Sequence, residues 1–152
     1  MIEEGQKAPD FALESTEGRI VRLSDLKGTP VVLYFYPKDD TPGCTTEACS
    51  FRDAFADIEA TGAALYGVSL DGLDSHEKFR EKYNLPFPLL SDPEGEVAKK
   101  YGAWGTKKKS GKEYEGVIRS TFVIGGDGTV KTVFPKVTPE GHAGEVLGAL
   151  TG

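Results

Sequence analysis

The sequence has few of the residues on which disulfide scaffolds and metal sites depend. Its 152 residues include two cysteines, Cys44 and Cys49, and two histidines, His76 and His142. Two cysteines do not make the disulfide framework of a small secreted domain. The histidines lie far from the cysteines in the sequence, so the Cys/His spacing of a zinc site is absent. A local Cys–His pair is also absent, so an activated cysteine here would need a different activating group.

Long apolar runs and an excess of positive charge are absent as well. No run approaches the roughly 20 apolar residues of a membrane-spanning helix, and the acidic start, residues 1–5, lacks the features of a secretory signal. We therefore expect a cytoplasmic protein that does not bind membranes. The net charge is −6, from 18 basic and 24 acidic residues, which disfavours nucleic acid as a partner. The one basic cluster, Lys107-Lys108-Lys109 with Lys112, is typical of a solvated loop, although it would also suit an acidic partner.

Hydrophobic periodicity predicts one domain, residues 1–152, that alternates strands and helices. The order of elements predicts an α/β fold, with a mixed central sheet, helices on both faces and an N-terminal β-hairpin. The expected strands are 11–13, 20–23, 31–36, 64–70, a short one within 85–90, 120–124 and 129–134; the expected helices are 44–61, 74–82, 96–101 and 139–150, with 102–117 as a long loop or irregular hairpin. Asp74 and Ser75 are the predicted cap of the second helix.

The junction between strand 31–36 and the helix that follows it is the most promising place for chemistry. The strand reads VVLYFY and is predicted to be buried on both faces. Cys44 then begins the helix, where unpaired N–H groups and the helix dipole favour a thiolate. A buried structural cysteine is the alternative, but Gly43 and Thr45 are not core residues, and we place Cys44 outside the apolar stripe. Thr41 is close enough for its hydroxyl to bond a sulfur or a bound oxygen ligand.

Cys49 lies five residues after Cys44 on the same predicted helix. In a regular α-helix the two Cα atoms would be about 8.7 Å apart, beyond the roughly 7 Å limit for a disulfide. Either the two cysteines never bond, or oxidation unwinds the first turns of the helix. On local grounds, a buried structural cysteine and a reactive one are equally consistent with position 49.

Three segments of the sequence together resemble one known family. Residues 34–49, YFYPKDDTPGCTTEAC, contain P-x-x-x-T-x-x-C after an aromatic strand. This string is similar to the active-site motif of the peroxiredoxins, in the bacterioferritin comigratory protein or peroxiredoxin Q branch. Residues 5–11, GQKAPDF, and 119–124, RSTFVI, also match at fitting separations. The resemblance covers essentially the whole chain. It implies a thioredoxin-like fold and thiol-based reduction of hydrogen peroxide and organic hydroperoxides, with no cofactor or metal.

The resemblance also implies roles for individual residues. Cys44 would be the peroxidatic cysteine, which attacks the peroxide and becomes a sulfenic acid. Thr41 and Arg119 would position the peroxide and polarise its oxygens, and Arg119 would also hold Cys44 as a thiolate. Pro37 would shield the thiolate, and Glu47 would orient the arginine. Without the resemblance, Arg119 is an ordinary charge at the end of a strand, and Glu47 is an acid that complements the helix dipole.

Cys49 matches the resolving cysteine of this branch. It would attack the sulfenic acid and form an intramolecular Cys44–Cys49 disulfide, which thioredoxin or a similar dithiol protein would reduce. Turnover would then require local unfolding of the helix. We expect a monomer, with a dimer as the alternative.

Two other functions compete with the peroxidase hypothesis. A general thiol–disulfide oxidoreductase would usually carry C-x-x-C, and the wider spacing here argues against it. A non-catalytic binding or chaperone module with the same fold would have inert cysteines. Tyr101 and Trp104 would line the approach to Cys44 in the peroxidase, although core packing is the alternative for both.

Overall fold

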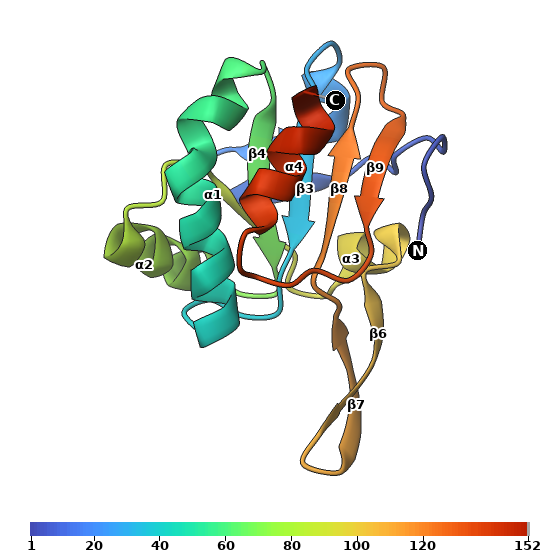
Figure 1. Cartoon of the computed structure of the whole chain (residues 1–152). Helices are drawn as coiled ribbons and strands as arrows, with labels where there is room; N and C mark the ends of the chain where they lie inside the picture. The colour runs from blue at the N-terminus through green and yellow to red at the C-terminus, as the bar shows by residue number, and fades with distance from the viewer. Residues whose placement is uncertain (152) are drawn as a thin grey trace.

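Seven strands form the mixed sheet on which the molecule is built (Figure 1). The structure, a computed structural model, describes residues 1–151. The strand order is β2-β1-β5-β4-β3-β8-β9. The bounds are β1 (Ala12–Ser15), β2 (Ile20–Arg22), β3 (Val31–Phe35), β4 (Ala64–Ser69), β5 (Leu89–Ser91), β8 (Ser120–Ile124) and β9 (Val130–Phe134).

Strand β3 lies in the middle of this sheet and carries the chain toward the predicted site. It pairs in parallel with β4 and antiparallel with β8. Every residue of β3 is buried, which confirms the prediction from its continuous apolar run. The last pair of the β3–β8 ladder joins Phe35 to Ser120. Arg119 therefore lies one residue beyond this pair, at the end of the sheet where β3 leads into the loop before Cys44.

The helices cover both faces of the sheet, as predicted. Their bounds are α1 (Pro42–Ala60), α2 (Leu73–Tyr83), α3 (Glu96–Tyr101) and α4 (His142–Thr151), with a 3-10 turn η1 (Leu23–Leu26). Buried residues of α1, α2 and α4 form one core with Val32, Tyr34 and Tyr36. Those of α3 join the core on the other face, and Figure 1 shows α1 and α4 in front of the sheet. No helix within residues 1–151 combines the length and the apolar character that a membrane span requires.

Three helices begin at residues that differ from the prediction, and one of them, α4, begins at His142 and not at residue 139. Helix α1 begins at Pro42, two residues early, because proline fits the first turn of a helix, where its missing N–H is not needed. Helix α2 follows Gly72 and has no side-chain cap. The predicted cap at Asp74 and Ser75 is therefore wrong: the Ser75 hydroxyl instead donates a hydrogen bond to Asp39 Oδ2 at 2.8 Å.

The basic segment forms a regular β-hairpin and not a loop. Strands β6 (Trp104–Lys109) and β7 (Lys112–Val117) pair without interruption from Trp104↔Val117 to Lys109↔Lys112. Ser110 and Gly111 make the turn, with φ of 54° and 77°, the left-handed pair that a tight two-residue hairpin requires. Figure 1 shows this hairpin extending from the body at the same end as the start of α1.

Candidate active site

Cys44 lies in the first turn of α1 and is almost completely buried, at 2% exposure. It belongs to the core beneath α1, together with Ala48 and Phe51. The expectation that it lies outside the apolar stripe is therefore wrong, because residues 44, 48 and 51 follow the helical spacing i, i+4 and i+7. Cys44 thus packs as a core residue and also occupies the helix N-terminus, where the dipole favours a negative sulfur.

Arg119 connects the cysteine to a buried acid. Its Nη2 donates to the Cys44 sulfur at 3.3 Å, and its Nη1 donates to Glu47 Oε1 at 2.7 Å. The two acceptors lie three residues apart on α1, so one guanidinium reaches both with its two terminal nitrogens. The permanent positive charge at this distance stabilises negative charge on the sulfur. The structure therefore brings together Cys44 and Glu47 with Arg119, which is distant from both in the sequence.

Glu47 has no exposed side-chain surface. Burial raises the pKa of its carboxyl to about 7, and the adjacent Arg119 guanidinium only partly offsets this effect. Its second oxygen, Oε2, has no hydrogen-bond partner among the described residues. By contrast, 18% of the Arg119 side chain is exposed. The charge that this part of the site presents to solvent is therefore that of the arginine.

Thr41 and Pro37 belong to the loop between β3 and α1. Thr41 is the residue before the helix, and its hydroxyl donates to the Lys38 carbonyl oxygen at 2.8 Å. The structure thus places this hydroxyl on the backbone of its own loop and not on the sulfur, while the lone pairs of its oxygen remain able to accept a bond. Pro37 is half-buried and follows directly after the buried Tyr36.

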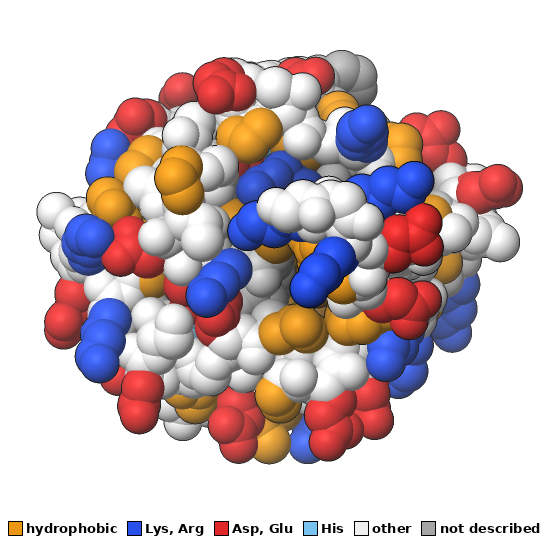
Figure 2. Space-filling view, turned by 90° about the horizontal axis from the view of Figure 1, so that it is seen from below, with side chains coloured by type: hydrophobic (Ala, Val, Ile, Leu, Met, Phe, Trp, Pro, Cys, Tyr) orange, Lys and Arg blue, Asp and Glu red, His pale blue; other side chains and the backbone are white. Residues whose placement is uncertain are grey.

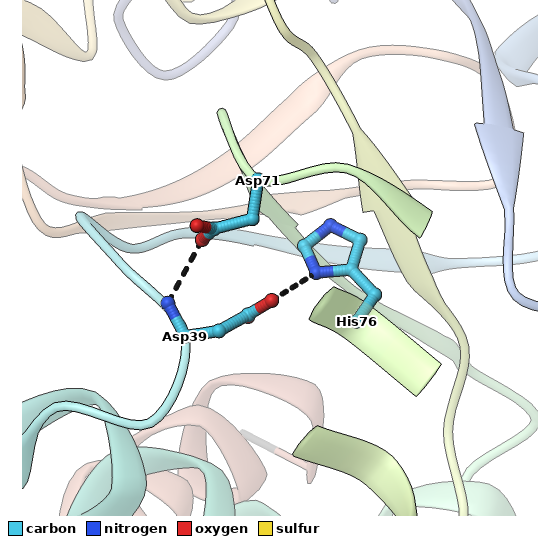
Figure 3. Close-up of side chains that lie close together, drawn as sticks. All are labelled: Asp39, Asp71 and His76. Carbon is cyan, nitrogen blue, oxygen red and sulfur yellow. Dashed lines mark hydrogen bonds and ion pairs between the residues drawn. The ribbon is translucent and has the colours of Figure 1, made fainter. Parts of the chain in front are cut away.

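A buried hydrogen-bond network fixes the loop on which Cys44 depends (Figure 3). Asp39 Oδ2 lies 2.7 Å from His76 Nδ1, and the Asp39 backbone N–H donates to Asp71 Oδ2 at 2.8 Å. The Tyr36 hydroxyl donates to Asp39 Oδ1 at 2.5 Å. The other ring nitrogen of His76, Nε2, lies 2.8 Å from the Leu90 carbonyl oxygen. The loop is therefore attached to Tyr36, to Asp71 and to His76 of α2 immediately before α1 begins, and His76 is in turn bonded to β5.

Sequence reasoning missed this network. In the sequence His76 stands out only as remote from the cysteines, and nothing local connects it to Asp39, 37 residues away. Asp39, Asp71 and His76 lie close enough to be considered as a metal site, with ligand atoms within 4.8 Å of one another. Both nitrogens of His76 are already engaged in hydrogen bonds. We interpret the cluster as a structural network, because a metal would have to displace these bonds.

Cys49 lies further along α1, is half-buried and has a free thiol, as has Cys44. Both cysteines are within continuous α-helix, so the distance of about 8.7 Å between their Cα atoms applies. The structure therefore represents the arrangement expected of the reduced protein.

Tyr101 and Trp104 do not line the approach to Cys44. Tyr101 is fully buried in the core on the opposite face of the sheet, and its hydroxyl donates to the Pro9 carbonyl oxygen at 2.6 Å. Trp104 packs against this same core, and the Lys99 ammonium lies 4.7 Å from its ring centre. The core-packing interpretation is correct for both residues.

The fold and the site together define a class of protein. A thiol lies at the N-terminus of the helix that follows the central strand, and an arginine contacts its sulfur. The second cysteine is five residues away, and not three as in a C-x-x-C motif. These are features of a thiol-dependent redox enzyme on a thioredoxin-like fold.

Comparison with known proteins identifies the family. The sequence profile of the AhpC/TSA family matches residues 4–133. The peroxiredoxin Bcp of Bacillus subtilis is 50% identical over 149 residues, which cover 98% of this chain and 95% of the relative. The structure of a mutant peroxiredoxin Q from Xylella fastidiosa superposes with a TM-score of 0.93 at 33% identity, covering 99% and 96% of the two chains. That of the Xanthomonas campestris bacterioferritin comigratory protein superposes with a TM-score of 0.88 at 37% identity, covering 93% and 90%.

The chain belongs to the AhpC/TSA family, in the peroxiredoxin branch that contains Bcp and peroxiredoxin Q. It is a thiol-dependent peroxidase, and it acts on peroxide substrates with a thiol reductant.

Proposed function

We propose that Cys44 is the peroxidatic cysteine of this enzyme and that Cys49 resolves its oxidised form. The Cys44 thiolate attacks one oxygen of the peroxide, the O–O bond breaks, and the second oxygen leaves as water or an alcohol after taking up a proton. Cys44 is then a sulfenic acid. Cys49 attacks its sulfur, water leaves, and a Cys44–Cys49 disulfide forms. A dithiol protein such as thioredoxin transfers two electrons to this disulfide and restores both thiols.

One observation carries this proposal: the Arg119 guanidinium donates to Cys44 and to buried Glu47 at the same time. This arrangement stabilises the thiolate and leaves a cation beside the attacked oxygens, where negative charge develops. The Thr41 hydroxyl, held by the Lys38 carbonyl, is the second group proposed to position the peroxide. Glu47 fixes the arginine, and Pro37 shields the thiolate from side reactions.

The remaining properties follow from the same chemistry. We propose hydrogen peroxide and organic hydroperoxides as substrates; the Xanthomonas campestris relative was studied for alkyl peroxide reduction. A cytoplasmic location fits an enzyme whose disulfide must be reduced repeatedly by a dithiol. We also propose that the chain is a single domain and a monomer, because each step uses residues of one chain.

The test is a peroxide-consumption assay with thioredoxin, thioredoxin reductase and NADPH. Wild type is expected to turn over and to form one Cys44–Cys49 disulfide per chain. Cys44→Ser is expected to lose peroxide consumption. Cys49→Ser is expected to consume one equivalent of peroxide per chain, to form a sulfenic acid at Cys44 and then to stop. Full activity in Cys44→Ser would show that Cys44 is not the nucleophile. Full thioredoxin-linked turnover in Cys49→Ser would show that Cys49 is not the resolving cysteine.

A further inference from the structure

Lys107 of the β6–β7 hairpin directs its side chain toward the active site. Its Nζ donates a hydrogen bond to the Val117 carbonyl oxygen at 2.8 Å, at the base of the hairpin. Val117 precedes Arg119 by two residues, and Arg119 contacts the Cys44 sulfur. The ammonium group therefore lies where the hairpin joins the segment that carries the active-site arginine.

The charges around this ammonium group support the same placement. Burial lowers the pKa of Lys107, the positive charge of Arg119 lowers it further, and the negative charge of Cys44 acts in the opposite direction. Lys107 is therefore close enough to both groups to interact with them electrostatically. Glu47, the acid that pairs with Arg119, is fully buried, so it adds little negative charge at the surface.

The neighbouring lysines of the hairpin differ from Lys107. Lys108 lies 3.7 Å from Glu113 in an exposed ion pair. Lys109 is exposed and pairs in the strand register with Lys112, beside the turn. Figure 2, which looks at the end of the molecule from which the hairpin extends, shows Lys and Arg side chains around a hollow with hydrophobic side chains in it. Among the lysines of β6, Lys107 is the one that combines partial burial with a hydrogen bond to the base of the hairpin.

We propose that Lys107 is a specificity residue that makes the enzyme favour hydroperoxides carrying a carboxylate over uncharged hydroperoxides of the same size. This inference rests on the proposed role of Cys44. An ammonium group has three N–H donors, and the bond to Val117 uses one of them. A second N–H of Lys107 donates to a carboxylate that lies a few bonds from the O–O group of the substrate. The O–O group itself faces Cys44 and Arg119. Lys107 and Arg119 then form a positively charged entrance to the active site, on a molecule whose net charge is −6.

The test compares two substrates: a tertiary alkyl hydroperoxide with a terminal carboxylate, and its methyl ester. The measured quantity is the ratio of kcat/KM for the acid to kcat/KM for the ester at low ionic strength. This ratio is expected to exceed one in wild type and to fall about fivefold in Lys107→Gln, as for the loss of one solvent-exposed ion pair. Lys107→Arg, which keeps the positive charge, is expected to keep the ratio of wild type. Added salt is expected to reduce the ratio in wild type.

Lys109→Gln is the matched control. It removes the same charge from the same strand, two residues nearer the turn, and is expected to leave the ratio unchanged. An unchanged ratio in Lys107→Gln, or an equal fall in Lys109→Gln, would overturn the assignment of Lys107. Failure of the proposed function would look different, because Cys44→Ser would then still consume both substrates.

Discussion

The two terminal nitrogens of Arg119 have different acceptors, a thiol sulfur and a carboxylate. This fork depends on the planar guanidinium, because a lysine ammonium is a single point of charge. Glu47 lies beneath the arginine in a position without solvent, where a charge is stable only when it is paired. The proposed chemistry of Cys44 therefore depends on a pair of residues that stabilise each other.

Arg119→Lys is expected to lower kcat/KM for peroxide by about 10- to 100-fold, because an ammonium cannot satisfy Glu47 and polarise the reacting oxygens together. Stopped-flow measurement of peroxide reduction checks this value. Arg19→Lys is the control, because the Arg19 side chain is 66% exposed and lies in the turn between β1 and β2. A rate for Arg119→Lys equal to that of wild type would contradict the role of the fork.

Glu47→Gln is expected to change how stability depends on pH. The pKa of Glu47 is about 7 in the folded protein against an ordinary value of 4.5, so the folded state binds this proton more tightly than the unfolded state. The stabilisation is fully present below pH 4.5 and is lost as the pH rises through 7. Across this window the free energy of unfolding of wild type is expected to fall by about 3 kcal/mol relative to Glu47→Gln.

Urea unfolding of reduced protein over a series of pH values measures this difference. Glu94→Gln, at an exposed position in a turn, is the matched control and is expected to follow wild type. A difference between wild type and Glu47→Gln that stays constant from pH 4.5 to 7 would show that Glu47 does not titrate there.

Fixed contacts lie on either side of the segment of α1 that unwinds in the proposed catalytic cycle. Before it, Asp39 fixes the loop through the bonds to His76 and Asp71. After this segment, Phe51 of α1 stacks on Tyr34 with ring centres 4.6 Å apart. The residues between these two anchors contain both cysteines, so unwinding can remain local while the rest of the helix stays packed.

Amide hydrogen exchange is expected to show this change directly. In the disulfide form, residues 44–50 are expected to lose protection relative to the reduced form, because a regular helix separates the two Cα atoms by about 8.7 Å and a disulfide permits about 7 Å. Residues 53–60 are expected to stay protected. Cys49→Ser treated with the same peroxide is the control. Unchanged protection at 44–50, in protein whose mass shows the disulfide, would contradict local unwinding.

The molecule as a whole places two separate cores on the two faces of one sheet. Alternate residues of β3 enter different cores: Val31, Leu33 and Phe35 face α3, while Val32 and Tyr34 face α1. The core on the α1 side includes Cys44. The packing of β3, β4 and α1 therefore also sets the position of the Cys44 sulfur.

Gly67→Ala is expected to destabilise the protein by about 1–3 kcal/mol through overpacking of this core. A Cβ atom at Gly67 would lie 2.8 Å from the Tyr34 ring and 2.9 Å from Leu89 Cδ2. Gly144→Ala is the matched control: on α4 its Cβ would meet no atom within 4 Å, so a gain of about 0.5–1 kcal/mol is expected. Urea unfolding compares the two variants, and an undiminished stability of Gly67→Ala would show that β4 adjusts freely.

Much of the architecture could be predicted because it is encoded in local patterns. The run at 31–36 predicted a strand buried on both faces, and the helical spacing from residue 48 onward predicted α1. The apolar run at 120–124 predicted β8, which its pairing with β3 confirms. The start of α2 was predicted less well, because Ser75 bonds a residue that is 36 positions away. The regular pairing of the basic hairpin was not expected either, since the Ser110-Gly111 turn was not recognised.

The sequence by itself determined the fold class, the family resemblance and the place of Cys44 at the start of a helix. These features depend on short-range periodicity and on motifs within a few residues. Only the tertiary structure decided that Arg119 reaches Cys44 and Glu47, that His76 anchors the loop, and that Lys107 turns back toward the site. The physical reason is that these contacts join residues 10 to 75 positions apart, and their geometry depends on how the sheet brings its strands together.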